Sequence, residues 1–263
     1  ATVDAHTYIH EMGHVFGLDD YYDYNKPQVA GAAGGAIMQS YNVGDHDPYS
    51  KFALGWINPL IPSDNATITL KPFSESGQTI LLTNKTALNT PFDEYILIDY
   101  YTGSNLNYYD ALSKYGGNKV RGPQLPLEKG IRIWHVDARL ANYNFDGTKY
   151  QITSQVDDLN GRYYHLTSNS SDGVYASKEI EYRDYRLLHL IQKTFMNTYS
   201  TKQNTYFSAK EMFIEGDVFS VQRYQAVFEN RTKLNDGSKL NYEIEVKSLT
   251  DECATIEVRT ING

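Results

Sequence analysis

The sequence predicts an α+β protein in which a helical, glycine-rich first part precedes a mostly antiparallel β-rich part. In residues 5–17 the apolar side chains recur three and four positions apart, which is the period of an amphipathic helix. Beyond residue 60, apolar and polar residues alternate, which is typical of strands with one buried face. We therefore divide the chain into residues 1–60 and residues 61–263, and we expect the second part to be sandwich-like.

Two helices are expected in the first part. The first begins at Ala5 and ends at Gly17, because glycine readily adopts the left-handed conformation that follows a helix. Its apolar residues are Tyr8, Ile9, Met12, Val15 and Phe16. The second runs over residues 48–54, with proline in its first turn and Gly55 after its end. Between them, the small residues at 30–38 favour a tight turn over a strand.

The second part contains several runs with the composition of strands. Two of them, 242–247 and 254–259, alternate strictly between apolar and polar residues, and they lie close enough to form a closing hairpin. The other expected strands are 67–70, 79–83, 94–101, 130–136 and 185–192.

Composition excludes several classes of protein. A net charge of −8 argues against a nucleic-acid binder, which needs a basic surface. No stretch is long and apolar enough to span a membrane, and the first ten residues lack the pattern of a signal peptide. Cys253 is the single cysteine, so no internal disulfide is expected.

The motif His10-Glu11-Met12-Gly13-His14 carries the clearest chemical signal. Residues four apart lie one turn apart on the same face of a helix, so His10 and His14 can bind one Zn²⁺ ion through their imidazoles. Glu11 lies on the flank of that face, poorly directed for a ligand but near a water at the metal. A glutamate so placed is the general base of metal-assisted peptide hydrolysis.

The third ligand must come from beyond the helix. A turn at Gly17 lets the chain fold back, and Asp20 can then reach the metal. Asp19 is the alternative, although the spacing favours Asp20. The competing interpretation is a chance motif with two solvated histidines. Five matching positions on one helix and its end favour the metal site.

The segment HEMGHVFGLDDYYDY, residues 10–24, resembles the zinc signature of the immune inhibitor A family of secreted bacterial metallopeptidases, which are metzincin-like. The segment DPYSKFALGWINP, residues 47–59, is the other specific part of this resemblance. Weaker support extends over residues 35–42, 94–101, 130–137 and 216–220. The resemblance implies a secreted or surface-attached zinc endopeptidase that acts on proteins or peptides.

The same resemblance implies roles for individual residues. His10, His14 and Asp20 would be the zinc ligands, and Glu11 would be the general base. The family also often carries structural Ca²⁺, which is therefore a further expectation.

Met38 would be the methionine of the turn that lies beneath the metal in metzincins, where its role is packing. Tyr41 follows Met38 by three positions, whereas related metzincins have a catalytic tyrosine two positions after the methionine. Both a catalytic contact and plain packing therefore stay open for Tyr41. Tyr21, Tyr22 and Tyr24 either line the lower side of a cleft or form a surface run.

The remaining histidines and acidic clusters have simpler interpretations. His46 could contact substrate or a second cation, but a solvated loop residue is the default. His135 is expected to be a satisfied core histidine, and His6 could share the face of the zinc helix. Residues 45–47 and 157–160 could hold Ca²⁺, although neither follows the usual calcium-loop pattern.

Metzincin-like domains have a twisted sheet before the zinc helix, whereas this sequence begins nine residues before His10. We therefore expect it to represent such a domain from the zinc helix onward, with Ile9 and Val15 exposed. The alternative function is a non-catalytic module that binds protein or glycan and holds a structural or vestigial zinc. Structural zinc sites usually have four protein ligands, and only three can be named here. No feature of the sequence indicates an oligomeric state.

Overall fold

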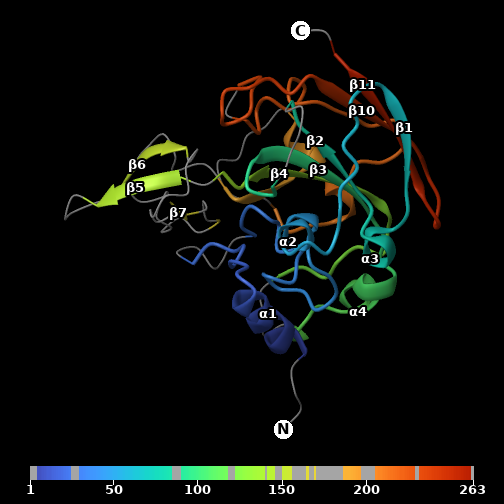
Figure 1. The fold of residues 1–263 in the computed structure, drawn as a ribbon. Coiled ribbons are helices and arrows are strands. Elements are labelled where there is room, and N and C mark those ends of the chain that lie inside the picture. Colours follow the sequence, from blue (N-terminus) through green and yellow to red (C-terminus); the bar gives the residue numbers. More distant parts are fainter. Residues whose placement is uncertain are drawn as a thin grey trace.

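A computed structural model describes most of the chain. Side chains are described for residues 5–24, 30–84, 90–117, 122–139, 169, 186–196, 205–228 and 231–261, and backbone alone for 141–145, 150–155 and 164–165. Helices are mixed with antiparallel sheets, two of which have four strands (Figure 1). This confirms the predicted α+β class. Among the described residues, no helix is long and apolar enough to cross a membrane.

The central sheet has the strand order β2-β3-β4-β8. Its strands are β2 (Thr79–Leu82), β3 (Glu94–Tyr101), β4 (Gly130–Asp137) and β8 (Leu188–Ile191). Every residue of β3 and β4 is buried, because other parts of the protein cover both faces of the sheet. Double coverage explains why these strands are nearly continuous apolar runs in the sequence.

The second sheet covers one face of the central sheet. Its order is β1-β11-β10-β9, with β1 (Ala66–Leu70), β11 (Ala254–Thr260), β10 (Tyr242–Leu249) and β9 (Val218–Phe219). Strands β10 and β11 form the expected hairpin. The core between the sheets includes Ile80, Leu82, Ile96, Ile98, Ile133, Ile244, Val246, Ile256 and Val258.

The first part of the chain covers the opposite face. Helices α1 (Ala5–Val15) and α2 (Pro48–Ala53) lie on that side of the central sheet, across from β1, β10 and β11 (Figure 1). The small-residue stretch 30–38 forms buried turns, as expected. The core on this side includes Tyr21, Ala33, Ile37, Tyr49, Leu81, Leu97, Trp134, Val136 and Leu190.

Several short elements were not predicted. Helices α3 (Phe73–Ser76) and α4 (Tyr108–Leu112) and the 3-10 helices η1 (Asn105–Asn107), η3 (Lys193–Phe195) and η4 (Ala209–Glu211) are each five residues or shorter. A third sheet has the order β6-β5-β7, with β5 (Ala141–Phe145), β6 (Tyr150–Gln155) and β7 (Tyr164–His165). A helix of five residues or fewer has too few turns for apolar periodicity to reveal it.

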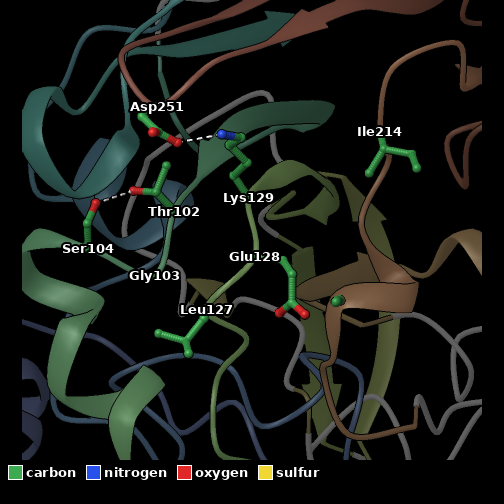
Figure 2. A pocket seen from close by; sticks show the side chains of 9 residues that line it. Thr102, Gly103, Ser104, Leu127, Glu128, Lys129, Ile214 and Asp251 are labelled. Atoms are coloured by element: carbon green, nitrogen blue, oxygen red, sulfur yellow. Dashed lines mark hydrogen bonds and ion pairs between the residues drawn. The ribbon is translucent and has the colours of Figure 1, made fainter.

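A pocket of about 580 Å³ opens where the end of β3, the loop before β4 and the β10–β11 hairpin meet (Figure 2). In it Lys129 forms an ion pair with Asp251, and the hydroxyls of Thr102 and Ser104 are 2.7 Å apart. No histidine lines the pocket, and none of the predicted metal ligands does. It is therefore distinct from the candidate site described below.

Asp110 on α4 fixes the loop that follows residues 37–42. Its Oδ2 accepts hydrogen bonds from the backbone N–H of Gly44 (2.6 Å) and of Val43 (2.9 Å). A Cβ at Gly44 would collide with the carbonyl oxygen of Leu106, so the loop and η1 pack backbone to backbone. Burial raises the pKa of Asp110, although the two N–H groups act in the opposite direction.

Replacing Asp110 with alanine is expected to lower the free energy of unfolding by about 1–3 kcal/mol, because two partly buried N–H groups lose their acceptor. Urea denaturation of Asp110→Ala measures this change. The matched control is Asp64→Ala, at an exposed position, whose effect should stay within about 0.5 kcal/mol. Equal effects of the two substitutions would contradict the assigned role.

Candidate metal centre

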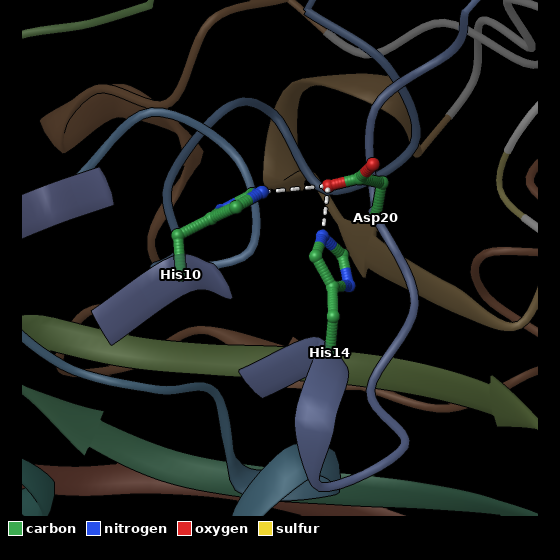
Figure 3. Close-up of side chains that lie close together, drawn as sticks. All are labelled: His10, His14 and Asp20. Atoms are coloured by element: carbon green, nitrogen blue, oxygen red, sulfur yellow. Dashed lines mark ion pairs between the residues drawn. The ribbon is translucent and has the colours of Figure 1, made fainter. Parts of the chain in front are cut away.

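Helix α1 and the segment that follows it bring His10, His14 and Asp20 together (Figure 3). Asp20 Oδ1 lies 2.9 Å from His10 Nε2 and 3.4 Å from His14 Nε2. His10 and Asp20 are buried, and His14 is partly exposed. The three residues are those that the sequence predicted as metal ligands.

The end of α1 explains how Asp20 reaches the histidines. Gly17 has a φ of +95° and its N–H donates to the carbonyl of His14 (2.9 Å), while the N–H of Leu18 donates to the carbonyl of Gly13 (3.0 Å). This pair of bonds is the Schellman motif, which ends a helix and reverses the chain. The sequence correctly predicted the end of the helix at Gly17.

Backbone carbonyls orient both imidazoles. His10 Nδ1 is 3.0 Å from the carbonyl oxygen of Met38, and His14 Nδ1 is 2.9 Å from that of Leu18. A carbonyl can only accept, so each Nδ1 carries a proton and donates it. The Nε2 atoms of both rings therefore face Asp20 Oδ1, and this contact raises the pKa of His10. Such outer hydrogen bonds are what fixes the tautomer of a metal-binding histidine.

Gly13 lets α1 approach the turn at residues 37–42. A Cβ at this position would collide with the side-chain amide of Gln39, which is fully buried. The side-chain N–H of Gln39 donates to the backbone carbonyl of His10 (3.2 Å), and the backbone carbonyl of Gln39 accepts from the N–H of Tyr21 (3.0 Å). One turn therefore holds both the helix and the segment that carries Asp20.

The two oxygens of Asp20 have different surroundings. Oδ2 accepts a hydrogen bond from the hydroxyl of Tyr24. Oδ1 is buried and has no hydrogen-bond partner among the described residues. Burial alone would raise the pKa of Asp20, but the facing His10, Tyr24 and His14 side chains lower it, so the carboxyl is ionised. An ionised oxygen buried without a hydrogen bond is costly, and a cation would compensate it.

The spacing of the donors fits zinc. Ligand atoms about 2.0–2.2 Å from a tetrahedral Zn²⁺ ion lie about 3.3–3.6 Å from one another. The two Nε2 atoms and Asp20 Oδ1 all lie within 4.8 Å of one another, with the separations from Oδ1 at 2.9 and 3.4 Å. Two imidazoles and a carboxylate are also an established type of donor set for zinc.

The other residues predicted for catalysis lie on the same side of the protein. Glu11 is exposed on α1 next to His10. Met38 is buried, and its carbonyl is the acceptor for His10. The ring of Tyr41 stacks on that of Tyr22, with centroids 5.8 Å apart.

The three tyrosines after Asp20 have different positions. Tyr21 is fully buried and its hydroxyl lies 3.1 Å from Ser50 Oγ, so it belongs to the core rather than to a cleft or surface run. Tyr22 is partly buried, and its ring packs against that of Tyr24, whose hydroxyl donates to Asp20 Oδ2. Burial and the Asp20 carboxylate raise the pKa of Tyr22 to about 12 and also raise that of Tyr24. Both hydroxyls are therefore donors at neutral pH. Nothing in the sequence indicated that the hydroxyl of Tyr24 contacts Asp20.

The remaining histidines lie outside the three-residue cluster. His135 is buried and its Nε2 is 2.7 Å from Glu94 Oε1, which confirms a satisfied core histidine. His6 Nδ1 donates to the carbonyl of Asn42 (2.7 Å), and its ring centroid is 5.2 Å from that of His10. His46 is partly buried against Trp56, and this burial lowers its pKa.

The acidic cluster at residues 45–47 has protein partners. Asp45 forms an ion pair with Lys51 (2.7 Å). Asp47 accepts from the N–H and hydroxyl of Ser50 at the start of α2 (2.9 and 2.6 Å). These carboxylates support local structure. The second predicted calcium cluster, residues 157–160, lies outside the described residues.

The apolar side of α1 faces away from the rest of the protein. The side chains of Ile9 and Val15 are 40% and 75% exposed, in agreement with the sequence-based expectation. The exposed apolar residues of the helix and its end are Tyr8, Ile9, Met12, Val15 and Phe16. His10 and Gly13 are its buried residues, so the helix packs through its metal-binding side.

Comparisons of the chain with protein-family models, curated proteins and solved structures gave no match. The geometry of His10, His14 and Asp20 therefore carries the assignment of the site.

Asp20→Asn is expected to weaken zinc binding by more than about 100-fold, because it removes the charge of the donor that both histidines face. Asp19→Asn is the matched control. It keeps the oxygen that accepts from the N–H of Asp20 (2.9 Å) and should bind zinc as the wild type does. Competition with a chromophoric chelator measures both affinities. A greater loss in Asp19→Asn would assign the third ligand to Asp19 instead.

Proposed function

We propose that the protein is a zinc-dependent endopeptidase of the immune inhibitor A type, acting on protein or peptide substrates. The observation that carries this proposal is the buried Asp20 oxygen without a hydrogen bond, which faces the Nε2 atoms of His10 and His14. Together with Glu11, these residues form the two-histidine motif of metal-dependent peptide hydrolysis.

The turn at residues 37–42 supports the metzincin-like part of the proposal. In that reading, Met38 is the methionine of the turn beneath the metal. Its side chain is buried and its carbonyl accepts from His10 Nδ1, so the turn and the first ligand are directly coupled. Its position in the sequence, after the glycine-rich stretch 31–35, agrees with the resemblance.

The metal and Glu11 would carry out different parts of the hydrolysis. A zinc ion at the site would act as a Lewis acid toward the attacking water and the scissile carbonyl. Glu11 accepts the proton of the attacking water and later passes it to the leaving amine. Because Nδ1 of His10 and of His14 donates to the carbonyls of Met38 and Leu18, the Nε2 atoms are the ones that would hold the metal.

The number of donors favours a catalytic over a structural zinc. Structural sites are closed by four protein ligands, whereas catalytic sites have three and leave a position for water or substrate. Among the described residues, the cluster contains three residues, each of which offers one ligand atom. The exposed flank that carries Glu11 and Met12 leaves that side of α1 accessible.

Glu11→Gln is expected to retain zinc and to lose peptidase activity by about 100-fold or more, because the amide cannot accept the proton. Glu75→Gln, an exposed glutamate on α3, is the matched control and should match the wild type in both respects. Zinc content by mass spectrometry and cleavage of a fluorescent protein substrate are the two measurements.

Two results would contradict the proposal. Undiminished cleavage by Glu11→Gln would remove the assigned general base. A zinc-loaded wild-type protein that cleaves no peptide would favour the alternative, a binding module with a structural zinc.

A further inference from the structure

The Asp20 carboxylate is held asymmetrically by its neighbours. Oδ1 faces the two imidazoles at 2.9 and 3.4 Å and has no hydrogen bond from the described residues. Oδ2 accepts from the hydroxyl of Tyr24. A carboxylate can bind zinc through one oxygen or through both. A hydrogen bond on one of them occupies one of its lone pairs and therefore favours coordination through the other oxygen.

The hydroxyl of Tyr24 is held in place by a hydrogen bond, although much of the residue is exposed. Half of the side chain is accessible to solvent (50%), yet the hydroxyl donates to a carboxylate that is buried. The ring packs edge-to-face on Tyr22, with centroids 5.2 Å apart and an interplanar angle of 72°. A half-exposed tyrosine can direct its hydroxyl to water, whereas this one directs it to Asp20.

Tyr22 extends this contact toward the protein interior. Its ring packs against that of Tyr24, and burial together with the nearby Asp20 carboxylate raises the pKa of its hydroxyl. Its ring stacks on Tyr41 at 5.8 Å and 23°. Tyr41 is itself confined, because a Cβ at Gly122 would collide with it. The stacked rings therefore form a support that ends at Oδ2 of Asp20.

We propose that Tyr24, supported by Tyr22, is a positioning residue that holds Oδ2 of Asp20 and leaves Oδ1 as a single-oxygen ligand for the metal. This inference rests on the proposed metal site. It assigns to Tyr41 a packing role behind Tyr22. It also explains why the tyrosines follow Asp20 directly in the chain: the segment that delivers the ligand delivers its hydrogen-bond donors as well.

Tyr24→Phe is the sharpest test, because it removes one hydroxyl and keeps the ring. We expect zinc affinity to fall about 10–100-fold, the usual cost of losing a hydrogen bond to a metal ligand. Tyr22→Phe should give a smaller loss in the same direction. Tyr109→Phe, with a side chain that is 76% exposed on α4, is the matched control and should leave affinity unchanged. Competition with a chelator measures the affinities, and circular dichroism checks the fold.

Cobalt(II) in place of zinc gives a readout that general destabilisation would not change. At saturating cobalt, release of Oδ2 lets both oxygens coordinate, which raises the coordination number. Cobalt with more than four ligands absorbs visible light more weakly than tetrahedral cobalt. We therefore expect weaker absorption bands for Tyr24→Phe and an unchanged spectrum for Tyr109→Phe.

The outcomes separate this inference from the proposed function. Wild-type affinity together with a wild-type cobalt spectrum in Tyr24→Phe would overturn the positioning role while leaving the metal site intact. Failure of the wild-type protein to bind either metal would overturn the site and this inference together. Because the readout is metal binding, the result holds whether or not the protein cleaves peptides.

Discussion

The candidate metal centre depends on the close approach of helix α1 to the turn at residues 37–42. Gly13 leaves no side chain at the point of contact, so the helix reaches Gln39 directly. At this distance His10 can donate to the carbonyl of Met38, which directs its other nitrogen toward Asp20. The carbonyl of Gln39 also accepts from the N–H of Tyr21, the residue after Asp20. A shift of this one turn would therefore move the first and third ligands together.

The central sheet fixes the position of the turn at residues 37–42. Ile37 belongs to the core that covers one face of β2, β3 and β4, and backbone hydrogen bonds tie the stretch before it to β8 and to the segment at Phe207. The N–H of Leu190 on β8 donates to the carbonyl of Ala32 (2.9 Å), and that of Phe207 donates to the carbonyl of Gly34 (2.9 Å). Because the sheet is buried on both faces, it offers a rigid base, which precise metal geometry requires.

Local geometry decides which features could be predicted from the sequence. The pairing of His10 with His14 and the turn at Gly17 depend on a few consecutive residues, so spacing alone indicated them. The expected strands 94–101 and 130–136 were visible as apolar runs because both faces of β3 and β4 are buried. The contacts of Gln39 and Tyr24 depend on the path of the chain in three dimensions, and no spacing rule reveals them. The period of α1 showed a helix, whereas the exposure of its apolar side was expected only from the resemblance to metzincin-like domains.

The asymmetric surroundings of Asp20 also bear on the choice of a carboxylate as third ligand. An anionic ligand reduces the positive charge of a bound zinc more than a third neutral imidazole would, and so makes it a weaker Lewis acid. A hydrogen bond to Oδ2 draws negative charge toward that oxygen and away from Oδ1, the oxygen that faces the histidines. Tyr24 and Tyr22 would therefore offset part of the cost of the carboxylate. The same contact that orients the ligand would then preserve the polarising power that peptide hydrolysis needs.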